Sequence, residues 1–476
     1  MKSRIFAVVT AILLVFTLTA PAASTAGRAR ALTASEWIVP EGYNEHDYNA
    51  VAFFLEQTDA EGVKNGFKLN PNYDPNDPNT WFNDAHGSNE CGVFFGDYDG
   101  EQRLWMIALR QFGFCGDIDL SNCPLLEMGT FENGNIVSAD FSNCSNLSYM
   151  CISNNRELDC LRLDNCQAIT MLFCDRTSIR ELDVGTMTAL EGLFCYETQI
   201  TDLDVSNCTA LRDLVCQAND ISFLDLSNCN QLMSAACDGC ALEEIILPAN
   251  SNVTNLVLNC TSNKLMNIDL SNSSCLSALY CADNSLKELD LSSCINLRSL
   301  DCSVNELTEI DTSFCPSLSQ LYCTDNRITQ FDFSSNPELA FDFIIAEGNG
   351  TIGYGYQSMY GELSAYVFAQ PDEGNEFVGW YNEAGEQLSA DKDFDFSSLI
   401  GSEPGLIARF AEKTVVPGDA NGDGAVDTED ALLVLRAALG IDGDPETLLE
   451  GCDMDENGAI DTTDALLILR LALGIS

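Results

Sequence analysis

A period of 21 residues in the middle of the chain most restricts how this sequence can fold. Consecutive blocks begin at Leu276, Leu297 and Leu318, and each carries the frame LxxLxCxxN. The period recurs about eleven times over residues 104–339. A block of this length cannot bury its own apolar side, so neighbouring blocks must stack and cover one another. The sequence therefore predicts a solenoid of short parallel strands.

The frame resembles that of the leucine-rich-repeat family, LxxLxLxxN/CxL. We expect the LxC segment to form a strand with Leu and Cys pointing inward. The resemblance implies that the Asn side chain of each block bonds the neighbouring backbone, so that successive blocks form a ladder. This position holds Asn219, Asn263, Asn284, Asn305 and Asn326, whereas Thr177, Thr198 and Cys240 interrupt it.

Most of the 22 cysteines fall into two columns of the repeat. Equivalent positions of stacked coils have parallel Cβ directions, which is poor geometry for disulfides. We therefore expect buried thiols that pack as small apolar side chains, and no metal site, because the CxxC of Cys237 and Cys240 has no second pair. The inward column contains Cys174, Cys195, Cys216, Cys237, Cys260, Cys281, Cys302 and Cys323, and the outer column contains Cys123, Cys144, Cys166, Cys208, Cys229, Cys294 and Cys315.

The residue before each inward cysteine should lie on the concave face of the solenoid. Candidates for a recognition surface there are Phe173, Phe194, Tyr280 and Tyr322. Aromatic side chains among scattered acids suit a protein or a glycan ligand. Ordinary surface variation is the alternative, and the sequence does not identify a ligand.

The start of the chain has the features of a secretory signal over residues 1–26. Lys2 and Arg4 precede an apolar stretch, Ile5–Leu18, that is shorter than the ~20 residues of a membrane span. We therefore expect a secreted, extracellular protein with no membrane span. The net charge of −51, from 22 Lys and Arg against 73 Asp and Glu, argues against nucleic-acid binding, because phosphate recognition needs basic side chains.

Two segments flank the repeats. Residues 27–103 are expected to form an N-terminal cap that shields the first coil, with helical spacing from Asn44 onward and both histidines, His46 and His86. Residues 340–413 show short alternating runs, with a hairpin expected in EFVGWYNEAGEQ. Through FVGWY and LIARFAEK, this segment resembles the B-repeat modules of internalin-type surface proteins, which implies a spacer or adhesion element.

Two acidic loops, 34 residues apart, each precede an apolar helix near the end of the sequence. Each loop offers oxygen ligands at positions 1, 3, 5, 7, 9 and 12, with Gly424 or Gly458 at the sharp turn, which is the pattern of a Ca²⁺ loop. Four carboxylates in each loop repel one another without a cation, so we predict two Ca²⁺ ions. The ligands are Asp419, Asn421, Asp423, the Ala425 carbonyl, Asp427 and Asp430, and then Asp453, Asp455, Asn457, the Ala459 carbonyl, Asp461 and Asp464.

Pro417 argues against a helix before the first loop, and Asp rather than Glu stands at position 12 of both loops. This duplicated loop–helix resembles a type I dockerin over residues 414–476. The resemblance implies Ca²⁺-dependent docking onto a cohesin module of a scaffoldin in a cellulosome-like assembly. Leu432 and Leu466 are expected in the intramolecular core. The resemblance places cohesin contacts at Thr428, Glu429, Leu435 and Arg436, and at Thr462, Thr463, Leu469 and Arg470.

These features favour a non-catalytic extracellular subunit that binds a scaffold through its tail and presents a repeat surface, in a setting of polysaccharide degradation. One alternative is an enzyme such as a glycoside hydrolase, which needs two carboxylates about 5–10 Å apart at a cleft. After the repeats, cap, β module and tail are assigned, no segment is long enough for a separate catalytic fold, so we expect no enzyme. Another alternative is a secreted adhesin or inhibitor.

Overall fold

The computed structural model describes residues 37–82, 91–248, 253, 255–336, 338–339, 343–359, 362–399, 405–413, 416–441 and 445–475. The expected signal segment and His86 lie outside these residues. Within them, no helix is both long and apolar enough to cross a membrane. The chain divides into two compact units, Met1–Arg180 and Glu181–Ser476, which we describe separately.

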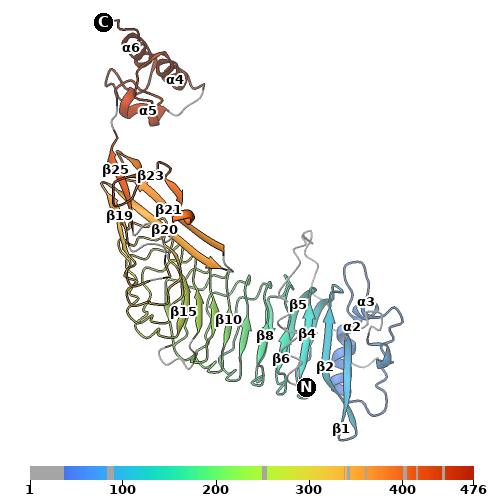
Figure 1. Ribbon diagram of the computed structural model, residues 1–476. Helices are drawn as coiled ribbons and strands as arrows, with labels where there is room; N and C mark the ends of the chain where they lie inside the picture. Colours follow the sequence, from blue (N-terminus) through green and yellow to red (C-terminus); the bar gives the residue numbers. More distant parts are fainter. Residues whose placement is uncertain are drawn as a thin grey trace. The chain divides into compact units, whose positions relative to one another are not determined.

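The first unit begins with a helical cap beside a sheet (Figure 1). Helix α2 (Glu45–Glu56) starts where the Asn44 side chain accepts a hydrogen bond from the Asp47 amide, so the helix expected there is confirmed. The other short helical segments are α3 (Asn65–Leu69) and η1 (Pro78–Thr80). Strands β1 (Gly92–Tyr98) and β2 (Glu101–Arg110) pair antiparallel, and the parallel ladder then begins at β2.

Parallel strands follow β2 in the order that the repeat predicts. One ladder joins β2 to β4 (Met128–Glu132), β6 (Tyr149–Cys151) and β8 (Met171–Phe173). The other joins β3 (Cys115–Asp119), β5 (Asn135–Asp140) and β7 (Cys160–Arg162). Each coil therefore contributes one strand to each ladder in this unit.

The second unit continues the repeat with short parallel strands. The main ladder contains β9 (Gly192–Phe194), β10 (Asp213–Val215), β12 (Ser234–Ala236), β14 (Leu256–Asn259), β15 (Leu276–Tyr280), β16 (Ser299–Asp301) and β17 (Gln320–Tyr322). A second, shorter ladder pairs β11 (Phe223–Asp225) with β13 (Glu244–Ile246). The predicted solenoid of parallel strands is thus confirmed.

The repeat core consists of the inward Leu and Cys columns. Leu279, Leu300 and Leu321, with Cys281 and Cys302, are fully buried. All 22 cysteines lie within the described residues, none forms a disulfide, and only Cys160 and Cys240 are more than marginally exposed. Burial accordingly raises the pKa of the inward thiols, as at Cys281, because a thiolate is unfavourable in an apolar interior.

Buried and half-buried side chains at the Asn position form hydrogen bonds between neighbouring coils. Asn305 Nδ2 donates to the carbonyls of Cys281 and Cys302 at 3.0 and 3.1 Å, and its Oδ1 accepts from the Leu286 amide at 2.9 Å. Thr198 supplies one such bond, to the Cys195 carbonyl at 3.0 Å. The expected ladder and its interruptions are therefore present. Equivalent bonds are made by Asn155, Asn219, Asn263, Asn284 and Asn326.

Two mostly antiparallel arrangements follow β17, with one parallel pair of strands. Strands β20 (Gly350–Met359), β21 (Glu362–Pro371) and β24 (Asp393–Asp395) continue its sheet. A five-stranded sheet has the order β18 (Gln330–Asp332), β19 (Phe343–Glu347), β25 (Gly405–Glu412), β22 (Asn375–Tyr381) and β23 (Gln387–Ser389), and η3 (Ser397–Leu399) lies between β24 and β25. The expected hairpin is the β22–β23 pair.

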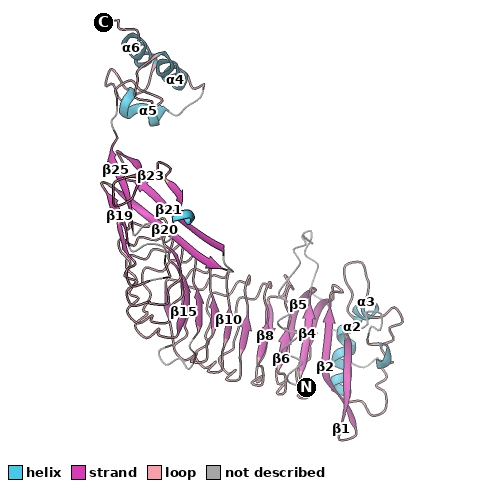
Figure 2. Ribbon diagram, viewed as in Figure 1, coloured by secondary structure: helices cyan, strands magenta, loops and turns pink. Residues whose placement is uncertain are grey.

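The tail is helical, as Figure 2 shows. Helices α4 (Thr428–Ala438) and α6 (Thr462–Ala472) follow the two loops, and α5 (Pro445–Cys452) precedes the second loop. Helix α5 was not predicted from the sequence. The tail has its own small core, formed by Ala431, Val434, Cys452, Ile460, Ala465 and Ile468.

Candidate functional site

The first acidic loop is folded around its own carboxylates. Asp419 accepts the amides of Gly422 and Gly424, one on each oxygen, both at 2.8 Å. Asp430 Oδ1 reaches back to the amides of Ala420 and Asn421 at 2.9 and 3.1 Å. The loop therefore brings its first and last acidic positions to the same turn.

The second loop repeats this arrangement. Carboxylate oxygens of Asp453, Asp455 and Asp464 lie within 4.8 Å of one another. Asp453 Oδ2 accepts the Gly458 amide at 2.8 Å, as Asp419 does with Gly424. Asn457 Nδ2 is 3.5 Å from Asp461 Oδ2, which places the middle of this loop next to its ninth position. Three of the six predicted ligand residues of this loop, Asp453, Asp455 and Asp464, therefore lie around one centre.

The ninth and twelfth loop positions also start the helices. Asp427 is the N-cap of α4 and accepts the Glu429 amide at 2.7 Å, while Asp430 Oδ2 accepts the Asp427 amide at 2.8 Å. Asp461 and Asp464 form the same reciprocal capping box at α6. Such a box satisfies backbone amides that a helix start leaves unpaired. The same side chains thus shape both the loop and the helix start.

The donor set suits a hard divalent cation. Asp430 and Asp464 are fully buried, and neither forms an ion pair with a Lys or Arg among the described residues. Buried carboxylates without a cation are costly, and Asp and Asn oxygens are the ligands that Ca²⁺ prefers. The amides of Ala425 and Ala459 are held by Asp423 and Asn457, both at 2.9 Å, so the seventh residue of each loop is anchored to the fifth.

An apolar groove of about 400 Å³ lies between α4 and α6. Each helix contributes residues from its first three turns, so the two halves of the groove are equivalent. Leu432 and Leu466 were expected in the core, but this prediction is wrong, because they are 52% and 55% exposed. Smaller Ala and longer Val or Ile side chains on the neighbouring helix face fill the core instead. The groove is lined by Thr428, Ala431, Leu432, Leu435, Thr462, Ala465, Leu466 and Leu469.

The remaining predicted contact residues are not among the residues that line this groove. Glu429, Thr463 and Arg470 are exposed, and Arg436 is half-buried. The groove brings together the predicted residues Thr428 and Leu435 with their counterparts in the second copy.

The aromatic candidates of the repeats lie at the ends of strands. Phe173 in the first unit contacts Tyr149, with ring centroids 5.6 Å apart. Phe194 ends β9, and Tyr280 and Tyr322 end β15 and β17 in the second unit. All four predicted residues are half-buried.

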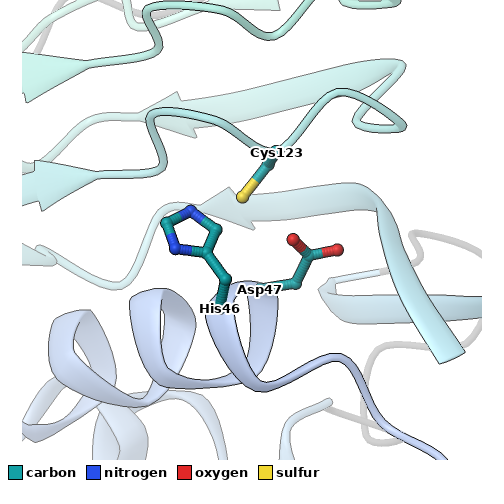
Figure 3. A group of neighbouring side chains, drawn as sticks. All are labelled: His46, Asp47 and Cys123. Atoms are coloured by element: carbon teal, nitrogen blue, oxygen red, sulfur yellow. The ribbon is translucent and has the colours of Figure 1, made fainter.

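A further cluster, not predicted from the sequence, lies under the cap. In Figure 3, His46 and Asp47 of α2 point toward Cys123 on the facing coil, with potential ligand atoms within 4.8 Å of one another. However, both oxygens of Asp47 accept from Arg103, at 2.8 and 3.3 Å, and His46 Nε2 is bonded to the Ser121 carbonyl at 2.7 Å.

Burial and the neighbouring Asp47 carboxylate raise the pKa of the Cys123 thiol. The thiol is therefore protonated near neutral pH, whereas a nucleophile or a metal ligand requires a thiolate. The carboxylate already has a cationic partner in Arg103. This cluster is best explained as a set of structural contacts that hold the cap against the first coils.

Two parts of the chain match known protein families. The type I dockerin domain family matches residues 417–471, and the leucine-rich-repeat family, in two copies, matches residues 295–336. No curated protein matches the chain. Dockerin domains generally bind calcium.

Several solved structures are similar to the chain. The functional domain of InlJ from Listeria monocytogenes, which includes a cysteine ladder, has 22% identity and a TM-score of 0.45, covering 65% of this chain and 75% of that one. An internalin, inlF, from Listeria monocytogenes has 17% identity and a TM-score of 0.34, covering 50% and 84%. YopM from Yersinia enterocolitica has 23% identity and a TM-score of 0.40, covering 47% of each. The two family matches identify leucine-rich repeats at residues 295–336 and a type I dockerin domain at residues 417–471 of this chain.

Proposed function

We propose that this protein is a non-catalytic extracellular subunit that binds a cohesin module of a scaffoldin through its Ca²⁺-dependent tail. Its repeats then present a recognition surface in a cellulosome-like, polysaccharide-degrading assembly. We assign residues 1–26 to a signal peptide, 27–103 to the cap, 104–339 to the repeats, 340–413 to a B-repeat-like spacer and 414–476 to the dockerin.

The main support is the exposed groove between α4 and α6. Two of its leucines, Leu432 and Leu466, are about half exposed in a domain whose core is already filled by other residues. Exposed apolar side chains gathered between two helices are typical of a protein interface. The two loops set the starts of these helices, so cation binding and docking are expected to be linked.

The metal sites proposed here hold one Ca²⁺ in each loop. In the first loop Asp419, Asn421, Asp423, Asp427 and Asp430 provide side-chain oxygens, and the second loop provides their counterparts. Each ion would offset the repulsion of four carboxylates, and the loop would fold around it.

The test is binding of the full chain to a panel of cohesin modules, in calcium and in EDTA. We expect capture by at least one cohesin in calcium and none in EDTA. The double variant Leu432→Ala/Leu466→Ala should weaken binding by about tenfold or more, since buried interface leucines contribute most of such affinity.

The matched control is Leu439→Ala/Leu473→Ala. These leucines are both 57% exposed, similar to the groove leucines, but lie outside the groove. The control should bind within about twofold of the unmodified chain. Equal losses for both pairs, or capture that EDTA does not affect, would contradict the proposal.

An enzyme such as a glycoside hydrolase is the second candidate. It would require paired carboxylates at a cleft. Release of reducing sugars from plant polysaccharides by the purified chain would favour it over a binding role. An adhesin or inhibitor would instead bind its target regardless of EDTA.

A further inference from the structure

One row of side chains crosses the strands of the second unit on the face opposite the buried leucines. Tyr280, Asp301 and Tyr322 are in register on β15, β16 and β17. Strands β20 and β21 extend the row through Gly355 and Tyr366. We call these five residues the tyrosine row. The four side chains of the row are half-buried, so each remains partly exposed, whereas Gly355 is buried.

The side chains of the tyrosine row lie close enough together to form one continuous surface. Adjacent strands are about 4.8 Å apart, so Asp301 lies between two rings. The Tyr280 hydroxyl is 3.4 Å from Ser299 Oγ, and the rings of Tyr322 and Tyr366 have centroids 6.2 Å apart. A Cβ atom at Gly355 would overlap the Tyr366 ring. Glycine there lets this ring lie over the strand and approach Tyr322.

The charged residues within the parallel strands of the main ladder are all acidic. Strands β9, β10, β12 and β14–β17 contain Asp213 and Asp301 and no Lys or Arg. Asp301 Oδ1 accepts from the amide and hydroxyl of Ser303 at 3.1 and 2.7 Å, which fixes the carboxylate. Its Oδ2 makes no hydrogen bond to another described residue.

Two interactions therefore favour a cationic side chain beside Asp301. Aromatic ring faces attract cationic side chains, and a fixed carboxylate forms strong charge-assisted hydrogen bonds with them. The net charge of −51 adds long-range attraction for a basic partner. A neutral sugar would also stack on the rings and could donate hydroxyl hydrogen bonds to Asp301, but it would gain nothing from the long-range attraction of the net charge.

We infer that the tyrosine row binds an extended basic segment of a protein partner, with a Lys or Arg side chain over Asp301 between Tyr280 and Tyr322. This inference rests on the proposed function, in which the repeats recognise a ligand. It narrows that ligand to a polypeptide with cationic side chains.

The test measures fluorescence anisotropy of a labelled (Lys-Ser)₄ peptide with the full chain in calcium at 150 mM salt. Asp301→Asn should weaken binding about fivefold or more, and Tyr322→Leu about threefold. The control is Asp290→Asn, because Asp290 also accepts the amide of the serine two residues later, at 2.9 Å, but is not in the row. It removes the same charge and should weaken binding less than about twofold.

Equal losses for Asp301→Asn and Asp290→Asn would mean only general attraction to an acidic protein, and would overturn the inference. Binding of cellohexaose that Tyr322→Leu abolishes, with no effect of Asp301→Asn on the peptide, would instead assign the row to a glycan. Unchanged melting temperatures confirm that the variants are folded.

Cohesin capture of the same preparations separates this inference from the proposed function. If the row does not bind the peptide but calcium-dependent capture persists, only the inference fails. If capture fails while Asp301→Asn still weakens peptide binding, only the scaffold-attachment proposal fails.

Discussion

Replacing Asn305 by Ala tests how the turns of the repeat are held. The substitution removes the hydrogen bonds that Nδ2 donates to the carbonyls of Cys281, Cys302 and Ser303. It also removes the bond that Oδ1 accepts from the Leu286 amide. A buried backbone group left without its partner costs about 1–3 kcal/mol. Asn305 is only half-buried, so water can replace some of these bonds. We expect the free energy of unfolding to fall by about 2–4 kcal/mol.

The chain contains its own comparison for this effect. Thr198 occupies the equivalent position and donates to one carbonyl, at 3.0 Å. Asn305→Thr should therefore keep only the bond to the Cys302 carbonyl and lose about 1 kcal/mol less stability than Asn305→Ala. A graded loss would show that the number of bonds, rather than side-chain volume, determines the effect.

The assay is urea unfolding followed by far-ultraviolet circular dichroism, with amide exchange at Leu286 as a local measurement. Local exchange is needed because repeat arrays often depart from two-state unfolding. The control is Asn296→Ala, which loses a single exposed bond of 2.8 Å to the Ser274 carbonyl and should change stability by less than about 0.5 kcal/mol. The reasoning would be refuted if Asn305→Ala lowered the free energy of unfolding no more than the control does. It would also be refuted if the Leu286 amide exchanged at the same rate in the variant and in the unmodified chain.

Three further predictions concern the tail and the thiols. EDTA should make the tail sensitive to limited proteolysis while the repeats resist, because loop folding is coupled to cation binding; equal resistance with and without EDTA would contradict this. Asp464→Asn should weaken calcium binding to the second loop by about tenfold or more in calorimetry, and an unchanged isotherm would argue against this ligand. Iodoacetamide should modify Cys240 before Cys281, because a hydrogen bond from Cys216 lowers the pKa of the partly exposed Cys240 thiol whereas burial raises that of Cys281. Mass spectrometry in which Cys281 reacts first would contradict the assignment.

The repeat could be predicted because its sequence frame is imposed by stacking. Every coil must bury the same positions, so the inward Leu and Cys recur at fixed spacing and reveal the strand. Asn155 was missed, although it makes the same bonds as Asn305. In its coil Ile152 occupies the inward position and Cys151 lies one residue away, so the local sequence does not match the frame.

In the tail, the spacing of apolar residues alone did not predict which side chains are buried. Apolar residues at helical spacing predicted α4 and α6, but spacing does not say which apolar face meets the core and which meets a partner. Leu432 and Leu466 were placed inside for this reason, whereas Ala431 and Ala465, next to them, are the buried residues. The small Ala431 and Ala465 side chains allow α4 and α6 to approach each other, and the larger Leu432 and Leu466 side chains then line the exposed groove. A helix before the second loop was also missed.

The loop carboxylates connect these observations. Asp427 and Asp430 bond the first turn of α4, and they also stand at the ninth and twelfth positions of the loop. A cation bound by both would hold the helix start against the loop, and the same holds for Asp461 and Asp464 at α6. Because the groove is lined from Thr428 and Thr462 onward, its two walls begin next to the proposed calcium ligands. Loss of the cation would therefore disturb the docking surface directly, without any change in the residues that contact the partner.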